Sequence, residues 1–401
     1  MKTPSTGTSL PPAGASPPFR EFTFHSRRGE EYARAFSEVD PGCRRPEMRD
    51  RARRQDRVLR LDLRRAVSAE MSVQFWGGHM GTSGERFRVN GGEWIDLPQP
   101  RNTPGPPEVY HRTMVGDHTV ALPLEELRHG ENRFQFTCGP QIKYDFGWGF
   151  YWVYSFTVRV FYEPVVPHPE AAVVLPQTGA ELAVFTPVQA SVAEAGARLV
   201  DFVGCYEDFD WEGDGERRKW HYQFLDAAPV RHIGSTCGPP WRVTWDTRWL
   251  PDQTEPMSVR ARVQDERGML SLTPAVEGLR LHRERRSVRL YPAEGVPEKF
   301  GCRVGERKSC VIPVEDDPSR ASVCLLILST WCGAHADEIA LNGRRVVRRV
   351  GRIHDVSHDR IAVPVAILRR GDNVFSIASS SKHHAVEVNW PGPALLVEYP
   401  L

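Results

Sequence analysis

Aromatic, imidazole, amide and carboxylate side chains gather in two stretches of the sequence, one in its first half and one near its end. The first set is Trp76, His79, Gln141, Tyr144, Asp145 and Trp148, and the second is Trp331, His335, His384, Glu387 and Trp390. A flat ring can stack on the C–H face of a sugar, while imidazoles, amides and carboxylates can take its hydroxyl groups. Both sets therefore predict a site for a glycan or another neutral small ligand, with Trp148 and Trp390 as the stacking rings.

The two sets share a spacing. In each, a tryptophan precedes a histidine by three or four residues on a glycine-containing loop, as in Trp76 with His79 and Trp331 with His335. A second polar loop follows shortly before the last strand of each copy. One interpretation is that the tryptophan closes the end of its β-structure. The other is that the two loops of each copy meet at one rim and form a ligand cleft.

A third cluster has the spacing of a calcium loop. Asp210, Glu212 and Asp214 precede Gly215 in the pattern D-x-E-x-D-G. Alternate side chains of such a loop can turn their oxygens to one calcium ion, and glycine permits the sharp turn. The twelfth position is His221 instead of a bidentate glutamate. A structural calcium ion and an exposed acidic hairpin both stay open, no other cofactor is required, and the nearby Trp211, Trp220 and Tyr222 make the segment a candidate contact surface.

The usual catalytic motifs are absent from the sequence, which contains no G-x-S-x-G, P-loop, G-x-G-x-x-G or H-E-x-x-H. A glycosidase needs two carboxyl groups about 5–9.5 Å apart. Glu85, Asp145, Glu338 and Glu387 lie on the predicted loops. Spacing along β loops does not fix the distance between such groups, so a binding protein without catalytic activity is preferred over an enzyme.

The overall composition excludes several classes of protein. Lys plus Arg number 52 and Asp plus Glu 51, so the net charge of +1 provides no basic surface for nucleic acid. No apolar run approaches the roughly 18 residues needed to cross a bilayer. The eight cysteines show neither C-x-x-C nor zinc spacing, which leaves the compartment open. Residues 1–19 are rich in Pro, Ser and Gly and lack an apolar segment, so we expect a disordered leader and not a signal peptide.

Short strands must position these side chains. Pro and Gly number 33 each and apolar heptads are absent, which favours an all-β chain with many turns. A sequence repeat supports this, because two segments share an Asn-Gly pair and a later Pro, Gly and Asn in register. The repeated positions are Asn90, Gly91, Pro123, Gly130 and Asn132 in the first copy and Asn342, Gly343, Pro364, Gly371 and Asn373 in the second. Asn-Gly is typical of a type I′ turn, whose central residues both have positive φ.

The repeat divides the chain into three parts after the leader. The repeated units, residues 20–164 and 284–401, suit jelly-roll sandwiches, and the alternating pattern of residues 165–283 suits a smaller sandwich. The outer units resemble the galactose-binding-like jelly-roll modules of bacterial glycan-active proteins, and the middle unit resembles a bacterial immunoglobulin-like domain. This resemblance implies a glycan partner, an extracellular or cell-surface location, and a middle domain that holds the two jelly rolls apart.

A run of alternating aromatic residues, YDFGWGFYWVYSF at 144–156, is too long for one ordinary strand. Gly147 and Gly149 divide it into a loop and the strand FYWVYSFTVRVFY. On this prediction the even-numbered side chains of the strand face the core, and only the preceding loop is free for a ligand. The expected core residues are Phe150, Trp152, Tyr154, Phe156 and Val158.

Three functions remain open from the sequence. The preferred one is a non-catalytic carbohydrate-binding protein that recognises a glycan through the rim loops of its jelly rolls. The first alternative is a glycoside hydrolase or polysaccharide lyase with its site on a rim or at a domain junction. The second is a structural surface or assembly protein, for which a homo-oligomer is expected.

Overall fold

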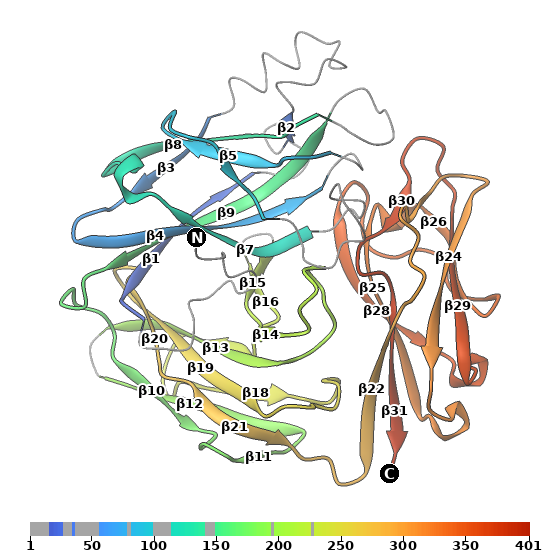
Figure 1. Cartoon of the computed structure of the whole chain (residues 1–401). Coiled ribbons are helices and arrows are strands. Elements are labelled where there is room, and N and C mark those ends of the chain that lie inside the picture. Colours follow the sequence, from blue (N-terminus) through green and yellow to red (C-terminus); the bar gives the residue numbers. More distant parts are fainter. Residues whose placement is uncertain are drawn as a thin grey trace.

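The computed structural model describes residues 16–26, 34–36, 56–77, 82–98, 114–140, 149–193, 196–225 and 228–401. Within these ranges the chain forms β-strands joined by turns and short 3₁₀ segments, and it contains no α-helix. The all-β prediction is therefore confirmed, and Figure 1 shows three β-sandwiches. In the same ranges no helix has the length and apolar character that a membrane span requires.

The N-terminal sandwich packs two sheets over one core. One sheet has the order β1-β9-β4-β7, with β2 also pairing with β9, and the other has the order β3-β8-β5-β6. The strands are β1 (Phe19–His25), β2 (Arg34–Phe36), β3 (Arg57–Leu61), β4 (Ala66–Trp76), β5 (Arg86–Val89), β6 (Ile95–Asp96), β7 (Met114–Leu122), β8 (Gly130–Thr137) and β9 (Phe150–Tyr162). Buried rings such as Phe87, Phe134 and Phe156 fill the space between the sheets, because alternate side chains of a strand point to one face.

The C-terminal sandwich repeats the two strand orders β1-β9-β4-β7 and β3-β8-β5-β6. Its sheets have the orders β22-β31-β25-β28 and β24-β29-β26-β27, and β30 and β23 extend the first sheet beside β25. The strands are β22 (Arg286–Pro292), β23 (Gly301–Cys302), β24 (Arg307–Val314), β25 (Val323–Trp331), β26 (Ala336–Leu341), β27 (Arg344–Val347), β28 (Val356–Val363), β29 (Gly371–Ser379), β30 (Val386–Val388) and β31 (Ala394–Pro400). The repeat seen in the sequence is therefore also a repeat of topology.

A shared hydrogen-bond network explains the repeated asparagines. Asn90 and Asn342 have φ angles of 52° and 53°, and the glycines after them have 79° and 75°, which confirms the predicted positive-φ turns. Asn132 Oδ1 accepts the Asn90 amide at 2.9 Å, and Asn373 Oδ1 accepts the Asn342 amide at 2.8 Å. Each pair therefore ties the Asn-Gly turn to the beginning of β8 or β29. The 3₁₀ segments are η2 (Leu124–Glu126), η3 (Pro318–Arg320), η4 (Gly333–His335) and η5 (Val365–Ile367).

The middle sandwich has a larger sheet, in which β13, β19 and β21 pair side by side, and a smaller sheet of order β10-β12-β18. Its strands are β10 (Ala171–Leu175), β11 (Glu181–Leu182), β12 (Phe185–Val192), β13 (Ala197–Glu207), β14 (Arg218–Trp220), β15 (Gln223–Leu225), β16 (Ala228–Val230), β17 (Gly234–Thr236), β18 (Arg242–Asp246), β19 (Met257–Asp265), β20 (Leu270–Leu272) and β21 (Val276–Leu281). Phe202 and Val259 are fully buried between the two sheets. Strands β15 and β16 form a separate hairpin.

The long strand β9 changes phase in a way that the sequence did not predict. Its bounds match the predicted strand, and Phe156 and Val158 lie in the core as expected. Nearer its start, however, the core side chains are the odd-numbered Tyr151 and Val153. The pairing of β9 with β4 shifts register at residues 74–75, and such a bulge moves the alternation by one residue. The other expected core residues contact the C-terminal sandwich instead, and they are Phe150, Trp152 and Tyr154.

One twelve-stranded sheet joins the N-terminal and middle sandwiches, because Phe19 at the start of β1 pairs with β20. Residues 1–15 of the predicted leader lie outside the described ranges, while Phe19 belongs to the sheet. Glu21 forms buried ion pairs with Arg159 at 2.8 Å and with Arg262. Arg262 also lies 2.7 Å from Asp201 of β13. A chain of buried charges therefore crosses between the two sandwiches.

The N-terminal and C-terminal sandwiches touch directly, so the middle one does not hold them apart as predicted. Trp76 at the end of β4 stacks on Trp331 at the end of β25, with ring centroids 4.7 Å apart and planes 13° apart. Trp152 packs into the same apolar cluster. Phe209 and Trp211 of the middle sandwich pack against the C-terminal sandwich. Each sandwich therefore contacts both of the others (Figure 1).

Candidate functional site

The predicted ligand residues Trp76 and Trp331 are buried in the contact between the two outer sandwiches. Their exposed fractions are 2% and 9%. On its other side the Trp331 ring stacks near His354, with centroids 5.8 Å apart. Rings enclosed in this way cannot stack on a sugar, so both leave the predicted ligand set. The two rings seal the contact between the outer sandwiches, an arrangement that neither interpretation from the sequence included.

The remaining predicted residues of the first copy lie outside the described ranges and stay predictions, and they are His79, Gln141, Tyr144, Asp145 and Trp148. In the second copy, Glu387 is only 4% exposed and Trp390 is half-buried. His335 and His384 do come together, with stacked rings 6.3 Å apart, and His384 also meets His354 at 4.0 Å. Burial, followed by the neighbouring histidines, lowers the pKa of His384. This rim is a histidine cluster beside an apolar contact.

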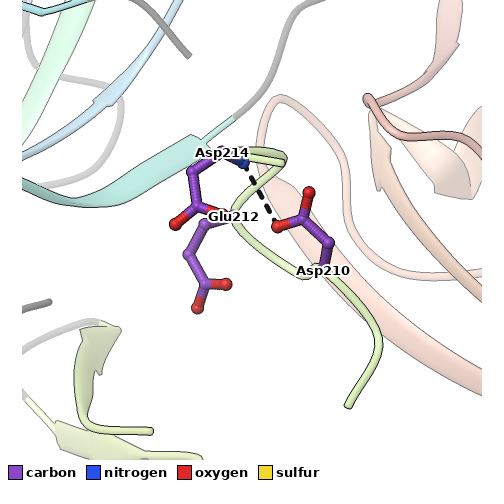
Figure 2. A group of neighbouring side chains, drawn as sticks. All are labelled: Asp210, Glu212 and Asp214. Atoms are coloured by element: carbon purple, nitrogen blue, oxygen red, sulfur yellow. Dashed lines mark hydrogen bonds between the residues drawn. The ribbon is translucent and has the colours of Figure 1, made fainter. Parts of the chain in front are cut away.

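The three predicted calcium ligands converge as expected. Figure 2 shows Asp210, Glu212 and Asp214 around one turn, and their ligand oxygens lie within 4.8 Å of one another. All three are buried, which corrects the interpretation as an exposed hairpin. Lys219 of β14 places its Nζ 3.5, 2.5 and 2.8 Å from Asp210, Glu212 and Asp214 respectively, and its side chain is 1% exposed. The ammonium supplies the positive charge that a calcium ion would bring, so calcium binding would have to displace it.

The charges of this acidic cluster are unequal. Burial raises the pKa of Asp210 to about 7, and the neighbouring carboxylates act in the same direction against Lys219. Burial also acts to raise the pKa of Asp214, but the Lys219 ammonium outweighs it, so the net pKa of Asp214 is lowered. Asp210 in addition accepts the backbone N–H of Asp214 at 3.2 Å, as Figure 2 shows, and that of Gly215 at 2.8 Å. The cluster therefore fixes the loop that carries Trp211.

A second group of aromatic and charged side chains lines an open cavity of about 260 Å³ where the middle and C-terminal sandwiches meet. We call it the junction cavity. Its aromatic residues are Tyr206, Trp211, Trp245 and Trp249, and its charged or titratable residues are Asp208, Arg231, His232, Asp246 and Arg360. Flat apolar surfaces and a few polar groups around one hollow are the usual composition of a small-ligand site.

Different elements bring these side chains together. Tyr206 comes from the end of β13, Asp208 and Trp211 from the loop after it, and Trp245 from β18. Arg360 comes from β28 of the C-terminal sandwich. The loop is held because the Asp208 backbone N–H donates to the carbonyl of residue 217 at 3.0 Å and the Trp211 indole N–H donates to Asp208 Oδ2 at 3.4 Å. The cavity is therefore built mainly by the middle sandwich, and Arg360 is the residue that the C-terminal sandwich adds to its wall.

The charged groups of the junction cavity lie close to its rings. The Arg231 guanidinium carbon is 4.2 Å from the centroid of the Trp211 ring, and that of Arg360 is 5.6 Å from it. Burial lowers the pKa of Arg231, with Arg360 adding to the effect and Glu212 and Asp208 opposing it. Asp208 is 6% exposed, and its Oδ1 has no hydrogen-bond partner among the described residues. A buried carboxylate oxygen without a partner is stabilised when it accepts a hydrogen bond from a ligand.

The sequence pointed to only part of the junction cavity. Trp211 was identified as a candidate contact residue, and it lines the cavity. The other two residues named with it lie elsewhere: Trp220 and Tyr222 pack in a separate buried cluster beside β13. Trp245 and Trp249 stand in the segment WRVTWDTRWLPDQ, where an uneven density of tryptophan was the available signal. Arg360 carries no local signal at all.

No known protein-family profile matches the chain, and no curated protein matches it. Among solved structures, it is similar to a β-porphyranase of glycoside hydrolase family 86 from the human gut bacterium Bacteroides plebeius, at 11% identity and a TM-score of 0.23. That match covers 54% of this chain and 35% of the β-porphyranase, so it involves about a third of the enzyme.

Two smaller proteins are matched over most of their own length. The chain is similar to fibronectin(III)-like modules of Clostridium thermocellum CbhA, at 10% identity and a TM-score of 0.19, over 55% of this chain and 91% of that one. It is also similar to a carbohydrate-binding module of the β-sandwich superfamily, at 11% identity and a TM-score of 0.16, over 58% of this chain and 97% of that one. At TM-scores of this size the similarities carry no argument about function.

Proposed function

We propose that the chain is a carbohydrate-binding protein that holds a glycan in the junction cavity. The observation that supports this most strongly is the meeting of Trp211, Trp245 and Trp249 with Asp208 and Arg360 around one open hollow. Sugar rings present apolar C–H faces and hydroxyl edges, which suit aromatic faces and hydrogen-bonding groups respectively. This proposal keeps the function expected from the sequence but moves its site away from the rim tryptophans.

The size of the cavity limits what it can hold. Pockets for drug-sized ligands measure about 300–1,000 Å³. At about 260 Å³ the junction cavity lies just below this range. It therefore suits a short piece of a glycan, such as a chain end, with the remainder of the chain outside. An extracellular location and self-association stay predictions beside this proposal.

The experiment is glycan-array binding of the full chain together with two tryptophan variants. Trp249→Ala removes a half-buried ring from the cavity. Trp94→Ala is the matched control, because Trp94 is also half-buried and also contacts arginine, 4.5 Å from the Arg88 guanidinium carbon, but belongs to the N-terminal sandwich. Losing one stacked, desolvated ring costs roughly 1.5–3 kcal/mol, or about a 10- to 100-fold rise in Kd.

The control variant should keep the wild-type Kd for every glycan retained on the array. Thermal unfolding of both variants shows whether any loss of binding comes from loss of fold. Equal Kd values for the wild type and Trp249→Ala would contradict the proposal. So would an absence of binding to any glycan by the folded wild-type chain.

A glycoside hydrolase is the second candidate, because two carboxylates, Asp208 and Asp246, line the same cavity. The side-chain hydrogen bond from Arg248 is the largest cause that holds the pKa of Asp246 low, so Asp246 is ionised near neutral pH and cannot donate a proton. Asp208 would have to be the acid. Release of reducing ends from a retained glycan, and its loss in Asp208→Asn, would favour the enzyme. Binding without product favours the first candidate.

A further inference from the structure

Two arginines from different sandwiches converge on one tryptophan of the junction cavity. The guanidinium carbons of Arg231 and Arg360 lie 4.2 and 5.6 Å from the Trp211 ring centroid. Arg231 follows β16 in the middle sandwich, while Arg360 is on β28 of the C-terminal sandwich. Like charges brought this close repel one another, and the repulsion is stronger next to protein than in water. A fold that keeps them together gains if an anion sits between them.

Two of the anionic groups near these arginines are engaged by other cations, Glu212 by Lys219 and Asp246 by Arg248. Glu212 lies 3.9 Å from Arg231 Nε but only 2.5 Å from the Lys219 ammonium. The Arg231 Nε itself donates to the Gln223 side chain at 2.7 Å. Glu212 therefore neutralises Lys219 more than it neutralises Arg231.

Arg360 is exposed and forms no ion pair with any residue in the described ranges. Asp246 of the cavity wall is bound by Arg248, whose guanidinium lies 2.6 Å from it. Asp208 forms no ion pair among the described residues: its Oδ2 accepts the neutral Trp211 indole N–H, and its charge opposes the fall in the pKa of Arg231. His232, the remaining titratable group of the wall, donates to or accepts from Ser235 at 2.7 Å. Arg360 thus has no ion pair among the described residues, while Arg231 shares Glu212 with Lys219 and lies near the one unpaired carboxylate of the wall, Asp208.

We propose that the glycan held in the junction cavity carries an anionic group, a carboxylate or a sulfate ester, and that Arg231 and Arg360 bind it together. This inference rests on the proposed function, since it names the class of glycan for the same site. A planar guanidinium donates paired N–H groups that match both carboxylate and sulfate oxygens. Trp249, the half-buried ring of the same cavity, would contact the apolar face of the same sugar. Because the two arginines belong to different sandwiches, the anion would also bridge them.

The test uses the full chain on an array of neutral, uronic-acid and sulfated glycans, followed by titration with two matched pairs of probes. One pair is oligogalacturonate and its methyl ester, and the other is dextran sulfate and dextran. The variants are Arg360→Gln and, as the control, Arg369→Gln, an exposed arginine in the turn before β29 of the opposite sheet. The first pair reports a carboxylate and the second a sulfate, so the two sources of anionic charge are distinguished.

Retained glycans should be anionic, and Arg360→Gln should raise their Kd about tenfold or more while Arg369→Gln leaves it unchanged. Binding should also weaken with added salt, since salt screens charges over about 10 Å at 0.1 M. If neutral glycans bind as well as charged ones and Arg360→Gln changes nothing, this inference is wrong while the proposed function stands. If anionic probes bind equally to both variants, the charge acts elsewhere and the inference is also wrong. If the folded chain retains no glycan, both fail.

Discussion

Replacing Lys219 by methionine tests the role of the acidic cluster beneath the junction cavity. Methionine keeps most of the length and the apolar stem of lysine and removes only the ammonium. In the wild type that ammonium lies 3.5, 2.5 and 2.8 Å from carboxylates of Asp210, Glu212 and Asp214, with 1% of the side chain exposed. Its removal leaves three buried carboxylates without their main cation.

The expected loss is large and depends on pH. Removing one partner of a buried ion pair costs about 3–5 kcal/mol. The pKa of Asp210 in the folded wild type is raised to about 7 by burial, above its unfolded value. A raised carboxyl pKa means that ionisation opposes folding, so this cost grows as pH rises from about 4 to about 7. Without Lys219 the pKa of Asp210 rises further and the pKa of Asp214 is no longer held low, so the loss of stability should be greater at about pH 8 than at about pH 5.

The assay is denaturant unfolding followed by tryptophan fluorescence at both pH values, with and without millimolar calcium. Lys382→Met is the control, because Lys382 is exposed and should cost little. Calcium should stabilise the Lys219→Met variant more than the wild type, since the carboxylate oxygens already lie within 4.8 Å of one another and the ammonium no longer competes. A loss that is equal at both pH values would refute the electrostatic reasoning. Equal stabilisation of both proteins by calcium would show that the ion, and not Lys219, is the native partner of the cluster.

Three further variants test the contacts that place the cavity. Trp331→Ala removes a ring stacked at 4.7 Å on Trp76, and we expect a loss of about 3–5 kcal/mol in unfolding free energy and faster hydrogen exchange in β4. Asn373→Ala removes hydrogen bonds to its loop at 2.8 and 2.9 Å, and the denaturation midpoint should fall by the equivalent of about 2–3 kcal/mol; an unchanged midpoint would contradict the role of the repeated asparagine. Burial raises the pKa of Glu21, but Arg262 and Arg159 outweigh it, so the net pKa is lowered. The stability of the wild type should therefore fall as pH drops below about 4.5. Arg262→Met should make that fall less steep in unfolding measurements at a series of acid pH values.

Local patterns in the sequence predicted local structure well. The Asn-Gly pairs, the Pro and the later Asn of each copy describe a turn and a loop that hydrogen-bond within about forty residues, and both copies fold as expected. The bounds of β9 followed from two glycines. The phase of its first half did not, because Tyr154 of β9 is an extra residue in the pairing with β4, opposite residues 74–75, and no glycine or proline marks that position in the sequence.

Contacts between sandwiches were beyond the reach of the same patterns. Trp76 and Trp331 were recognised as equivalent positions of the two sequence repeats. The sequence does not indicate that the two rings stack on each other. The acidic spacing was recognised, while Lys219, five residues beyond Asp214, occupies the centre only because β14 folds back beside β13. Arg360 enters the junction cavity through the docking of two sandwiches, which no spacing along the chain encodes.

The most direct test of the central claim is the structure of the full chain in complex with a glycan that it retains. We predict a sugar ring in the junction cavity, stacked on the half-buried Trp249 and within hydrogen-bond distance of Asp208 Oδ1. A sugar bound instead at the rim of Trp390 and His384, with the junction cavity unchanged, would contradict the account.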